Sequence, residues 1–598
     1  MKDKLGFKTK EDIFGRLVLF ASFGLYLVTL NPSVGLYDAG DMTTAAWVLG
    51  IPHPPGYPFY CLFGNLWMHL IPIGNIAYRL NMLSAFSSSI AIMLIYLISL
   101  KIVKSRIPSL ISSLSLAFSN TFWGQATFAG QYITNLFFFI LLLFLLFKYK
   151  ERLSLKILYL FFFTLGLSLA HHRQTLFIVP AAILFILAIL WKNRKKQFKI
   201  QNLKFKIPLT MALLFILPLT LYLYLPIRAS SHPPLNWSDP ETPNRFISHI
   251  KGSQYDFLFL KLKPKEYIAR FISQIRGLFP NEFGILLLSL GIAGLFAMAI
   301  KRTSIFLFLL LIFLTDVLIS VTYNHPSFQL YYMIPFAIFS LWIGFGAFFI
   351  LSFSKKKLAY IIFSLALLII PIKLFISNYK RNDHSLYYSP YNYCLNILRP
   401  IKKNGVIIAE DDTHSFLLEY FHYCESVRKD IALIEPHQLH FEWMANLYRE
   451  MYPDLEFKMY PVKKAILTYD EVRNQRIESM IEMNMERRPF YIFPSPSYPF
   501  ISRYEFLPCG VFSMVIKNDI SSQELYNLLL ETDYKMKYRK DENDSVYIIN
   551  YATSCFNRGR LYYNIRRYKE AILMAKEALR INPGYQSAEN LLKILKEE

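Results

Sequence analysis

Cysteine is scarce in this chain. The 598 residues include 5 Cys, and none of them has a second Cys at the CxxC spacing typical of metal and redox sites. This scarcity argues against a disulfide framework and against a metal cluster. One or two disulfides stay open for the cysteines of the last third, Cys394, Cys424, Cys509 and Cys555, if that region is extracytoplasmic.

Acidic residues are also few. Asp and Glu number 42 against 65 Lys and Arg, which gives a formal net charge of +23. Such an excess can indicate a nucleic-acid partner. Much of it lies in short loops between hydrophobic segments, as the positive-inside rule describes for membrane proteins. We therefore expect no nucleic-acid partner.

Hydrophobic residues, in contrast, are abundant and clustered. They make up 54% of the chain, aromatic residues make up 17%, and the mean hydropathy is +0.30. The clusters have the length that a membrane-spanning helix needs, so the sequence predicts an α-helical polytopic membrane protein with about eleven spans. The predicted spans are residues 13–30, 77–100, 108–122, 132–147, 157–170, 175–191, 207–225, 283–300, 304–321, 330–353 and 358–376.

The basic loops predict the orientation. Lysines before the first span place the N-terminus in the cytoplasm, and the span count then places residues 378–598 outside. The first span lacks a small-residue cleavage site, so we interpret it as an uncleaved anchor. Residues 59–71 are too short to span and predict an interfacial or re-entrant helix, and residues 226–281 predict a long outside loop. We expect a bacterial inner membrane with a periplasmic C-terminal region.

The C-terminal region has the character of a soluble domain. Residues 405–409 and 430–434 are β-branched runs that enclose a helical pattern at 415–424, and residues 490–493 and 511–516 are further strand candidates. This order predicts a small α/β domain.

The last fifty residues resemble a tetratricopeptide unit, because Gly559, Tyr562, Ala571, Ala578 and Pro583 occupy its characteristic positions. A single repeat needs a neighbour, so we expect it to pack on the α/β domain, with docking of a protein partner as the alternative. The predicted domains are a transmembrane catalytic domain at 1–377, an extracytoplasmic α/β domain at 378–548 and tetratricopeptide-like helices at 549–598.

The loop after the first span carries two carboxylates, Asp38 and Asp41. Ionisable residues beside a membrane core are costly and indicate function by default. Asp is also a good helix cap, so a structural role is the alternative. The stiff segment Pro52 to Pro58 follows, because each proline restricts its own φ and the residue before it.

Carboxylates, cations and aromatic side chains from five loops meet on the outside face of this topology. A sugar-transfer site with a lipid-phosphate donor needs these types: a carboxylate takes the acceptor proton or orients a metal, and Arg or His neutralises the leaving phosphate. Each also has a simpler interpretation, such as snorkelling for Arg173 and Arg228 or an aromatic belt for Tyr331 and Tyr332. No short ligand spacing supports a metal site.

Several motifs resemble one membrane family, long labelled a domain of unknown function. Its animal member is an endoplasmic-reticulum protein O-mannosyltransferase of plexin-type domains with a GT-C fold. The motifs are DAGD, GIPHPPGYPFY and AYRLNMLSA within residues 38–86, WGQATFAGQYITN (123–135), GLSLAHHRQT (166–175), YLPIRASSHPPLNWSDP (224–240), HIKGSQY (249–255), QLYYMIPFAIFSLWIGFG (329–346), AEDDTHSFLLEYF (409–421) and SVRKDIALIEPHQLHFEW (426–443). The chain departs from the family at Asp41, where Glu is usual, and at Gly130, where a second acidic residue is usual.

The resemblance implies a GT-C glycosyltransferase. It would invert the anomeric carbon while moving a sugar, with mannose as the candidate, from a polyprenyl phosphate to an extracytoplasmic acceptor such as a protein Ser/Thr hydroxyl. Asp38 would be the base and Asp41 would orient it or the donor; a divalent metal at these two residues stays open as a cofactor. The donor-phosphate candidates are Arg173, Arg228, His172 and His53, and the substrate-binding candidates are Tyr57, Gln131, Tyr132, Trp237, Tyr331 and Tyr332.

Other functions stay open. One is a transporter or flippase of a lipid-linked sugar; against it, we find no charged residue recurring through the predicted spans, where transporters place their sites. Others are a transferase with a glycan or lipid acceptor and a scaffold that displays the tetratricopeptide unit. Because the candidate residues all precede residue 340, we expect the C-terminal region to act in acceptor choice and not in the chemistry.

Overall fold

The structure is a computed structural model that describes residues 9–193, 206–409, 411–460, 468–493, 498–537 and 545–597. It divides into two compact units. The first comprises Met1–Pro32 and Ala45–Leu386, and the second comprises Ser33–Thr44 and Tyr387–Glu598. Residues 1–8 and 194–205, which contain basic residues used in the orientation prediction, lie outside the described residues.

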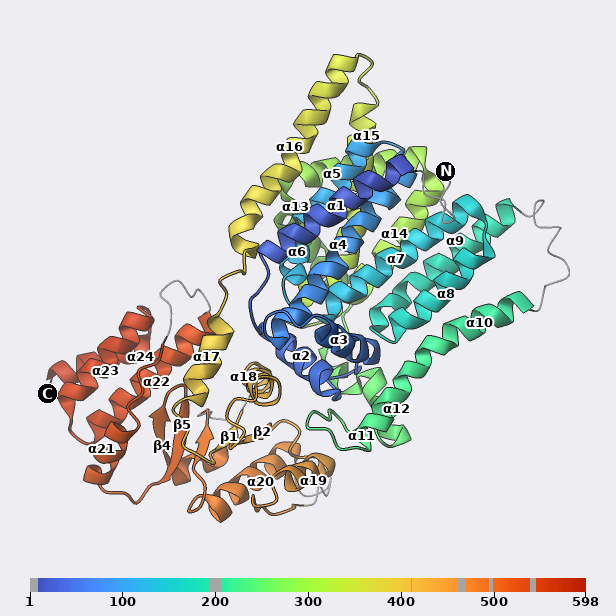
Figure 1. Cartoon of the computed structure of the whole chain (residues 1–598). Helices are drawn as coiled ribbons and strands as arrows, with labels where there is room; N and C mark the ends of the chain where they lie inside the picture. Colours follow the sequence, from blue (N-terminus) through green and yellow to red (C-terminus); the bar gives the residue numbers. More distant parts are fainter. Residues whose placement is uncertain are drawn as a thin grey trace. The chain divides into compact units, whose positions relative to one another are not determined.

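The first unit is helical (Figure 1). Its helices are α1 (Thr9–Val28), α2 (Asp38–Val48, shared with the second unit), α3 (Pro58–Leu70), α4 (Ile76–Val103), α5 (Arg106–Ala117), α6 (Asn120–Ala126), α7 (Gln131–Arg152), α8 (Leu155–Leu169), η1 (Arg173–Ile178), α9 (Val179–Lys192), α10 (Lys206–Leu219), η3 (Thr220–Leu223), α11 (Tyr224–Ala229), α12 (Pro243–Lys251), η4 (Ser253–Leu258), α13 (Pro264–Lys301), α14 (Thr303–Ser320), η5 (Phe328–Tyr332), α15 (Met333–Leu351) and α16 (Lys357–Asn382).

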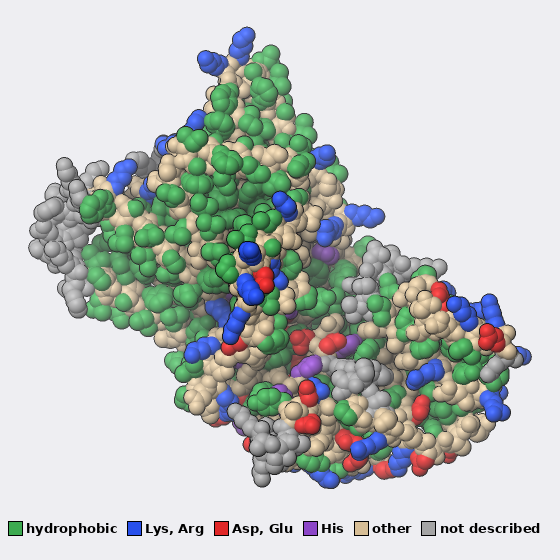
Figure 2. Space-filling view, turned by 180° about the vertical axis from the view of Figure 1, so that it is seen from behind, with side chains coloured by type: hydrophobic (Ala, Val, Ile, Leu, Met, Phe, Trp, Pro, Cys, Tyr) green, Lys and Arg blue, Asp and Glu red, His purple; other side chains and the backbone are tan. Residues whose placement is uncertain are grey.

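The apolar segments predicted to span the membrane are all helical. Eight helical segments among the described residues are long and apolar enough to cross a bilayer, and Ile13–Val28 and Leu155–Leu169 are shorter apolar helices. The remaining predicted span corresponds to α5, which has 12 residues. Figure 2 shows the matching surface, where hydrophobic side chains cover most of the visible face of this unit. The chain is therefore an integral membrane protein.

The centre of this unit is formed by α4, α7 and α15, whose apolar windows are 67–83% buried. Glycines let α13 and α15 approach closely. A Cβ on Gly294 would lie 1.8 Å from the Trp342 carbonyl oxygen, and one on Gly346 would lie 2.1 Å from the Leu290 oxygen. Small residues serve this purpose at helix contacts in membranes.

The long loop predicted at residues 226–281 is wrong in part. The structure has α11, α12 and η4 there, and α13 begins at Pro264 and runs for 38 residues with a kink at Gly284. Charged residues in the first turns of α13 lowered its hydropathy and concealed the helix. Its apolar side chains nevertheless recur at helical spacing and pack on the core; they are Tyr267, Phe271, Ile275 and Leu278.

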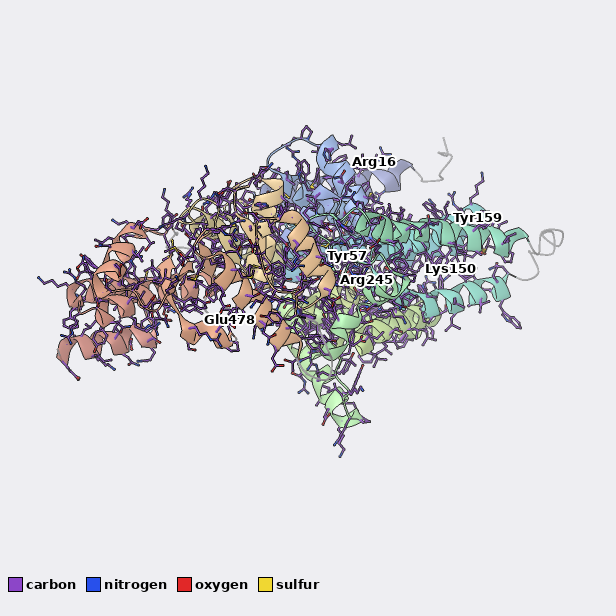
Figure 3. All side chains as sticks on the ribbon, turned by 90° about the horizontal axis from the view of Figure 1, so that it is seen from below. Arg16, Tyr57, Lys150, Tyr159, Arg245 and Glu478 are labelled. Carbon is purple, nitrogen blue, oxygen red and sulfur yellow. The ribbon has the colours of Figure 1, made fainter. Side chains whose placement is uncertain are left out.

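Basic residues gather at one end of the helical unit. Lys101 of α4 pairs with Glu151 of α7 at 2.5 Å, and the charges of Lys192 and Arg302 act on Lys150. Gln131 begins α7, so it lies at the opposite end of that helix from Lys150. Figure 3 labels Lys150 and, in another part of the same unit, Tyr57. The basic ends thus lie away from the candidate site residues near Gln131.

The second unit contains a five-stranded sheet in the order β2-β1-β3-β5-β4. β1 pairs in parallel with β2 and β3, while β5 pairs antiparallel with β3 and β4. The strands are β1 (Val406–Ile408), β2 (Ala432–Ile434), β3 (Phe490–Ile492), β4 (Tyr504–Cys509) and β5 (Phe512–Lys517). The helices are α17 (Ser389–Leu398), α18 (Asp412–Glu419), η6 (Tyr420–Cys424), α19 (Glu442–Met451), α20 (Tyr469–Asn484), η7 (Pro499–Arg503) and α21 (Ser522–Glu531).

Four predicted strands are confirmed and one was missed. The missed strand, β4, contains Pro508, which counts against a strand because it cannot donate to the ladder. The structure resolves this conflict by placing β4 at the edge of the sheet.

The chain's last helices are α22 (Ser545–Asn564), α23 (Tyr568–Ile581) and α24 (Gln586–Glu597). Gly559 brings α22 close to α23, since its Cβ would lie 3.2 Å from the Cβ of Met574, and Ala571 and Ala578 are fully buried. Arg558 of α22 donates to the Pro508 carbonyl of β4 at 3.1 Å. The helices therefore pack on the sheet, and their role as a tetratricopeptide unit stays a prediction.

All five cysteines lie among the described residues, and each is a buried free thiol. The disulfides left open for the last third of the chain are therefore not formed in this structure.

Candidate active site

The first cluster of candidate residues lies in the helical unit, around the turn before α3. Gly56 and Tyr57 have φ values of 91° and 41°, a conformation that favours glycine. This turn brings the Tyr57 hydroxyl within 3.2 Å of His53 Nε2. Tyr57 also begins α3 as its N-cap residue, so the stiff proline segment fixes where these side chains lie.

The segment His171 to Arg173, between α8 and η1, supplies the second part of this cluster. His171 Nε2 lies 2.9 Å from the Gln131 carbonyl oxygen, so Nε2 carries the proton and donates. His172 Nδ1 accepts from the Gln174 amide at 3.1 Å and caps η1. The His172 ring stacks with Tyr57 at 5.8 Å between centroids and contacts Tyr132 at the same separation.

Trp237 completes one side of the cluster. The Ile51 amide donates to Leu235 O at 2.8 Å, and the Trp237 amide donates to Ile51 O at 3.1 Å. These bonds hold the LNWSDP segment beside the HPPGYP turn and place the Trp237 ring 6.5 Å from His53. Tyr331 joins on the other side, 5.6 Å from Tyr132.

His249 of α12 belongs to the same cluster, although the sequence analysis quoted its motif without assigning it a role. It is 1% exposed, and its Nε2 would lie 2.9 Å from a Cβ at Gly56. The charge of His53 acts on it. The sequence could have indicated His249, because this histidine begins the HIKGSQY motif, which resembles a motif of a transferase family.

Burial keeps these imidazoles neutral. It lowers the pKa of His171 to about 4 and that of His249 to about 3. Burial, followed by the charges of His171, Arg173 and His53, also lowers the pKa of His172 well below its ordinary value. At neutral pH these rings offer neutral N–H donors, and the Arg173 guanidinium supplies positive charge.

Both candidate arginines hold helix C-termini. Arg173 donates to Lys251 O at the end of α12, and Arg228 Nε donates to Leu49 O at 2.7 Å, just after α2. Cations at this end of a helix interact favourably with its dipole. These bonds use part of the five donors of each guanidinium, so they orient the arginines and leave an anion-binding role as a prediction.

Tyr332 lies apart from the other candidates. Its hydroxyl donates to Gln274 Oε1 at 2.6 Å, and its ring contacts Phe328 and Phe336. Tyr332, the last residue of η5, is therefore packed in the core against α13 and α15, and its substrate-binding role stays a prediction.

A buried carboxylate lies next to this cluster and was missed. Asp316 of α14 is 0% exposed and accepts from Gln174 Nε2 at 3.0 Å; Gln174 Oε1 in turn accepts from Asn135 at 3.0 Å. Asp316 lies within the apolar run predicted at 304–321 and was given no role in the sequence analysis, which considered only charged residues that recur through the spans. Asp316 lies one turn before the end of α14, beside η1, and not at its middle.

Asp38 and Asp41 lie in the second unit, in the first turn of α2. Gly40 allows this turn to contact α18, because a Cβ there would lie 2.6 Å from Phe416 O. Thr44 Oγ1 lies 3.8 Å from Cys424 Sγ. The carboxylate loop is therefore packed by residues of the C-terminal region, and the expectation that this region acts in acceptor choice and not in the chemistry stays a prediction.

Carboxyl groups of three segments interact around Asp41, which is fully buried. Burial, with the charges of Asp41, Glu435 and Asp412, raises the pKa of Glu419 well above its ordinary value. Burial also raises the pKa of Glu435, which accepts from the His437 amide at 2.7 Å. Glu419 and Glu435 were not predicted, although both lie in the quoted motifs of residues 409–443.

Metal binding was left open for Asp38 and Asp41. Over the described ranges of the chain, no group of three or more His, Cys, Asp or Glu side chains is arranged to hold a metal ion. The structure thus offers carboxyl groups with raised pKa values in one unit, and neutral imidazoles, aromatic rings and arginine in the other.

Part of this chain is similar in sequence to a known protein family, and most of it is similar to two curated proteins. Residues 38–197 match the family described as the N-terminal domain of protein O-mannosyl-transferase TMEM260. Protein O-mannosyl-transferase TMEM260 of Mus musculus is 24% identical over 503 residues, which cover 80% of this chain and 70% of that protein. The Dictyostelium discoideum protein of the same name is 24% identical over 584 residues, covering 88% of this chain and 69% of the relative.

The fold is similar to that of ArnT from Cupriavidus metallidurans, solved with undecaprenyl phosphate bound. The TM-score is 0.51 at 9% identity, and the match covers 85% of this chain and 98% of the ArnT chain. Fold and similarity together define a membrane glycosyltransferase of the GT-C class. Within that class, the chain is similar to the proteins named protein O-mannosyl-transferase TMEM260, in agreement with the resemblance of its motifs.

Proposed function

We propose that the protein transfers a sugar, with mannose as the candidate, from a polyprenyl phosphate to a Ser or Thr hydroxyl of an extracytoplasmic protein. The relatives' names support the sugar and the acceptor, and the undecaprenyl phosphate bound to ArnT supports the class of donor. The observation that carries the proposal is the cluster of His53, Tyr57, His172 and Arg173, where neutral donors, a cation and aromatic rings meet.

The donor side of the reaction uses that cluster. Arg173 and the N–H groups of His53 and His172 would bind the phosphate and stabilise the charge that it gains as the leaving group. Tyr57, Tyr132, Trp237 and Tyr331 would cover the apolar faces of the sugar and the first isoprene units. Arg228 holds the end of α2 and would contribute its remaining donors, and the Gln131 side chain at the start of α7 would contact substrate beside them.

The acceptor side uses the carboxylates. The acceptor oxygen attacks the anomeric carbon, the bond from that carbon to the phosphate oxygen breaks, and the hydroxyl proton passes to Asp38. Polyprenyl phosphate leaves, and the configuration at the carbon inverts. Asp41 would orient Asp38 from its buried position, and Glu419 would limit the negative charge nearby because its raised pKa favours the protonated form.

A transfer assay tests this function. Purified full-length chain in nanodiscs is incubated with polyprenyl-phosphate mannose and an acceptor protein domain, and mannosylated peptides are counted by mass spectrometry. Asp38→Asn keeps the shape and removes the base, so we expect transfer to fall about 100- to 10,000-fold. Asp41→Asn should lose less. A helix cap alone would tolerate Asn, so activity of Asp38→Asn within a few-fold of the parent would overturn the assignment.

We also propose that the N-terminus is cytoplasmic and residues 378–598 are extracytoplasmic, in a bacterial inner membrane. The basic residues gathered at the ends of α4, α7 and α9 support this orientation. Reporters fused after Lys357 and after Glu598 should report cytoplasm and exterior, respectively. Reversed signals at both positions would place Asp38 in the cytoplasm and contradict an extracytoplasmic acceptor.

A further inference from the structure

His249 is a buried imidazole whose hydrogen-bonding capacity is unused. The side chain is 1% exposed, and neither ring nitrogen has a hydrogen-bond partner among the residues that the structure describes. A neutral imidazole has one donor and one acceptor, and a polar group that is buried without a partner destabilises a fold. His249 therefore lowers the folding stability of the unliganded protein, which suggests that the side chain serves a function such as ligand binding.

Gly56, which has no side chain, lies beside Nε2, and the Leu225 side chain packs against the same position. Gly56 faces this nitrogen, and a Cβ at that position would lie 2.9 Å from Nε2 and 2.8 Å from Leu225. The positive φ of Gly56, 91°, also favours glycine. Any other residue at position 56 would cover Nε2, so the turn and the imidazole are matched to each other.

The groups around His249 are basic. The charge of His53 acts on His249, and the guanidinium of Arg173 donates to Lys251 O and lies 3.0 Å from the Cβ position of Gly252, at the end of the same helix. The charge of Arg173 also acts on His172 of the same cluster, so a guanidinium lies among these neutral imidazoles. Together these groups favour an anion over a neutral hydroxyl.

We propose that His249 binds the phosphate of the lipid donor through a ring N–H, beside His53 and Arg173. This assignment rests on the proposed function and adds a residue to it. Gly56 and Leu225 lie beside Nε2 in the unliganded protein, so the proposal includes a shift of the turn at residues 52–58 as one stiff unit when the phosphate binds. The ligand then fills the hydrogen-bonding capacity that the unliganded protein leaves empty.

The test measures thermal unfolding of the full-length chain in nanodiscs with undecaprenyl phosphate, and with undecaprenol as the control without phosphate. The parent should be stabilised by the phosphate form only. His249→Leu removes the unpaired polar group, so its unfolding temperature without ligand should equal or exceed that of the parent. Its apparent affinity for undecaprenyl phosphate should fall about 10- to 100-fold, as the loss of a charge-assisted hydrogen bond predicts.

Two further variants sharpen this test. His249→Gln places an amide nitrogen near the position of Nε2 and should restore part of the affinity. His414→Leu is the matched control, because His414 is also 1% exposed but bonds the Tyr393 hydroxyl at 2.8 Å. His414→Leu should lower the unfolding temperature and keep the response to undecaprenyl phosphate.

The outcomes separate the two proposals. If the parent does not respond to undecaprenyl phosphate, the donor class under the proposed function is wrong, and this inference falls with it. If parent and His249→Leu respond equally, only the role of His249 is wrong. A marked fall in the unfolding temperature of ligand-free His249→Leu would show that the imidazole serves the fold and would also contradict the inference.

Discussion

Acidification should open the histidine cluster of the helical unit before it affects the rest of that unit. The pKa values of His171 and His249 are about 4 and about 3, below the ordinary value of about 6.5 for a solvated histidine. The open form therefore binds more protons as the pH falls. The stability that these groups contribute is complete above about pH 6.5 and is lost as the pH falls towards the folded pKa values.

The size of the effect follows from these shifts. Between pH 7.5 and pH 5.5, each histidine whose folded pKa lies well below 5.5 should lose about 1.4 kcal/mol of protection against opening. His171 and His249 together should lose about 2.8 kcal/mol, and the lowered pKa of His172 adds to the loss in the same direction, so the open fraction should grow by at least about 100-fold. Both side chains are fully or almost fully buried, so solvent screening reduces this figure little.

Hydrogen exchange of peptides covering residues 52–61 and 243–252 measures this opening. Comparing the parent with His249→Leu at one pH cancels the pH dependence of the intrinsic exchange rate. The variant lacks one of these groups, so the rise of its open fraction over this range should be about 10-fold smaller than that of the parent. Equal pH responses of the parent and the variant would refute the assignment of His249 as a neutral buried group.

Three further changes test the packing that positions the candidate site. Gly294→Ala should destabilise the contact between α13 and α15 by about 1–3 kcal/mol, because its Cβ would lie 1.8 Å from Trp342 O. Thermal unfolding in nanodiscs checks this. Gly277→Ala is the matched control, because its Cβ would meet no atom of the described residues within 4 Å. Gly40→Ala should separate the first turn of α2 from Phe416, because the new Cβ would lie 2.6 Å from Phe416 O. Sugar transfer should fall while the protein still inserts into the membrane. Unchanged transfer would contradict the role of this contact. Asp316→Leu removes one hydrogen-bond acceptor of Gln174 Nε2, a loss of about 1–3 kcal/mol, and should raise the KM for the donor more than it lowers kcat. Asp316→Asn keeps the acceptor oxygen and should raise KM less. Equal KM values for the two variants would count against positioning by Asp316.

The sequence predicts the membrane helices well because the bilayer sets their length and polarity. Residues 132–147 and 330–353, for example, need no information from elsewhere in the chain to be identified as apolar helices. The start of α13 was not predicted because only a few apolar residues, placed among charged ones, recur there at helical spacing. Their role becomes clear only in the structure, where they pack on the core. β4 escaped because the edge position that tolerates Pro508 is a property of the whole sheet.

The candidate site was predicted unevenly for a similar reason. His53, Tyr57, His172, Arg173 and Trp237 were identified from residue type and motif, and the structure brings them together in one unit. Glu419, Glu435 and Asp316 were missed because they are distinguished by burial and, for the two glutamates, by neighbouring charge. A local sequence pattern does not reveal either property. The assignment of Asp38 and Asp41 to the C-terminal unit depends on a contact between residues 40 and 416, which only the folded chain reveals.

The contact between Gly40 and Phe416 also has a consequence for biosynthesis. The two residues are separated by 376 positions (416 − 40), so ribosomes that add roughly 5–20 residues per second make Phe416 roughly 20–75 seconds after Gly40. Throughout that interval the first turn of α2 is made but its packing surface is not. A chain that stops before α18 therefore carries both candidate carboxylates without the element that packs them. Premature release from the ribosome thus yields a membrane protein whose carboxylate loop has lost its packing surface.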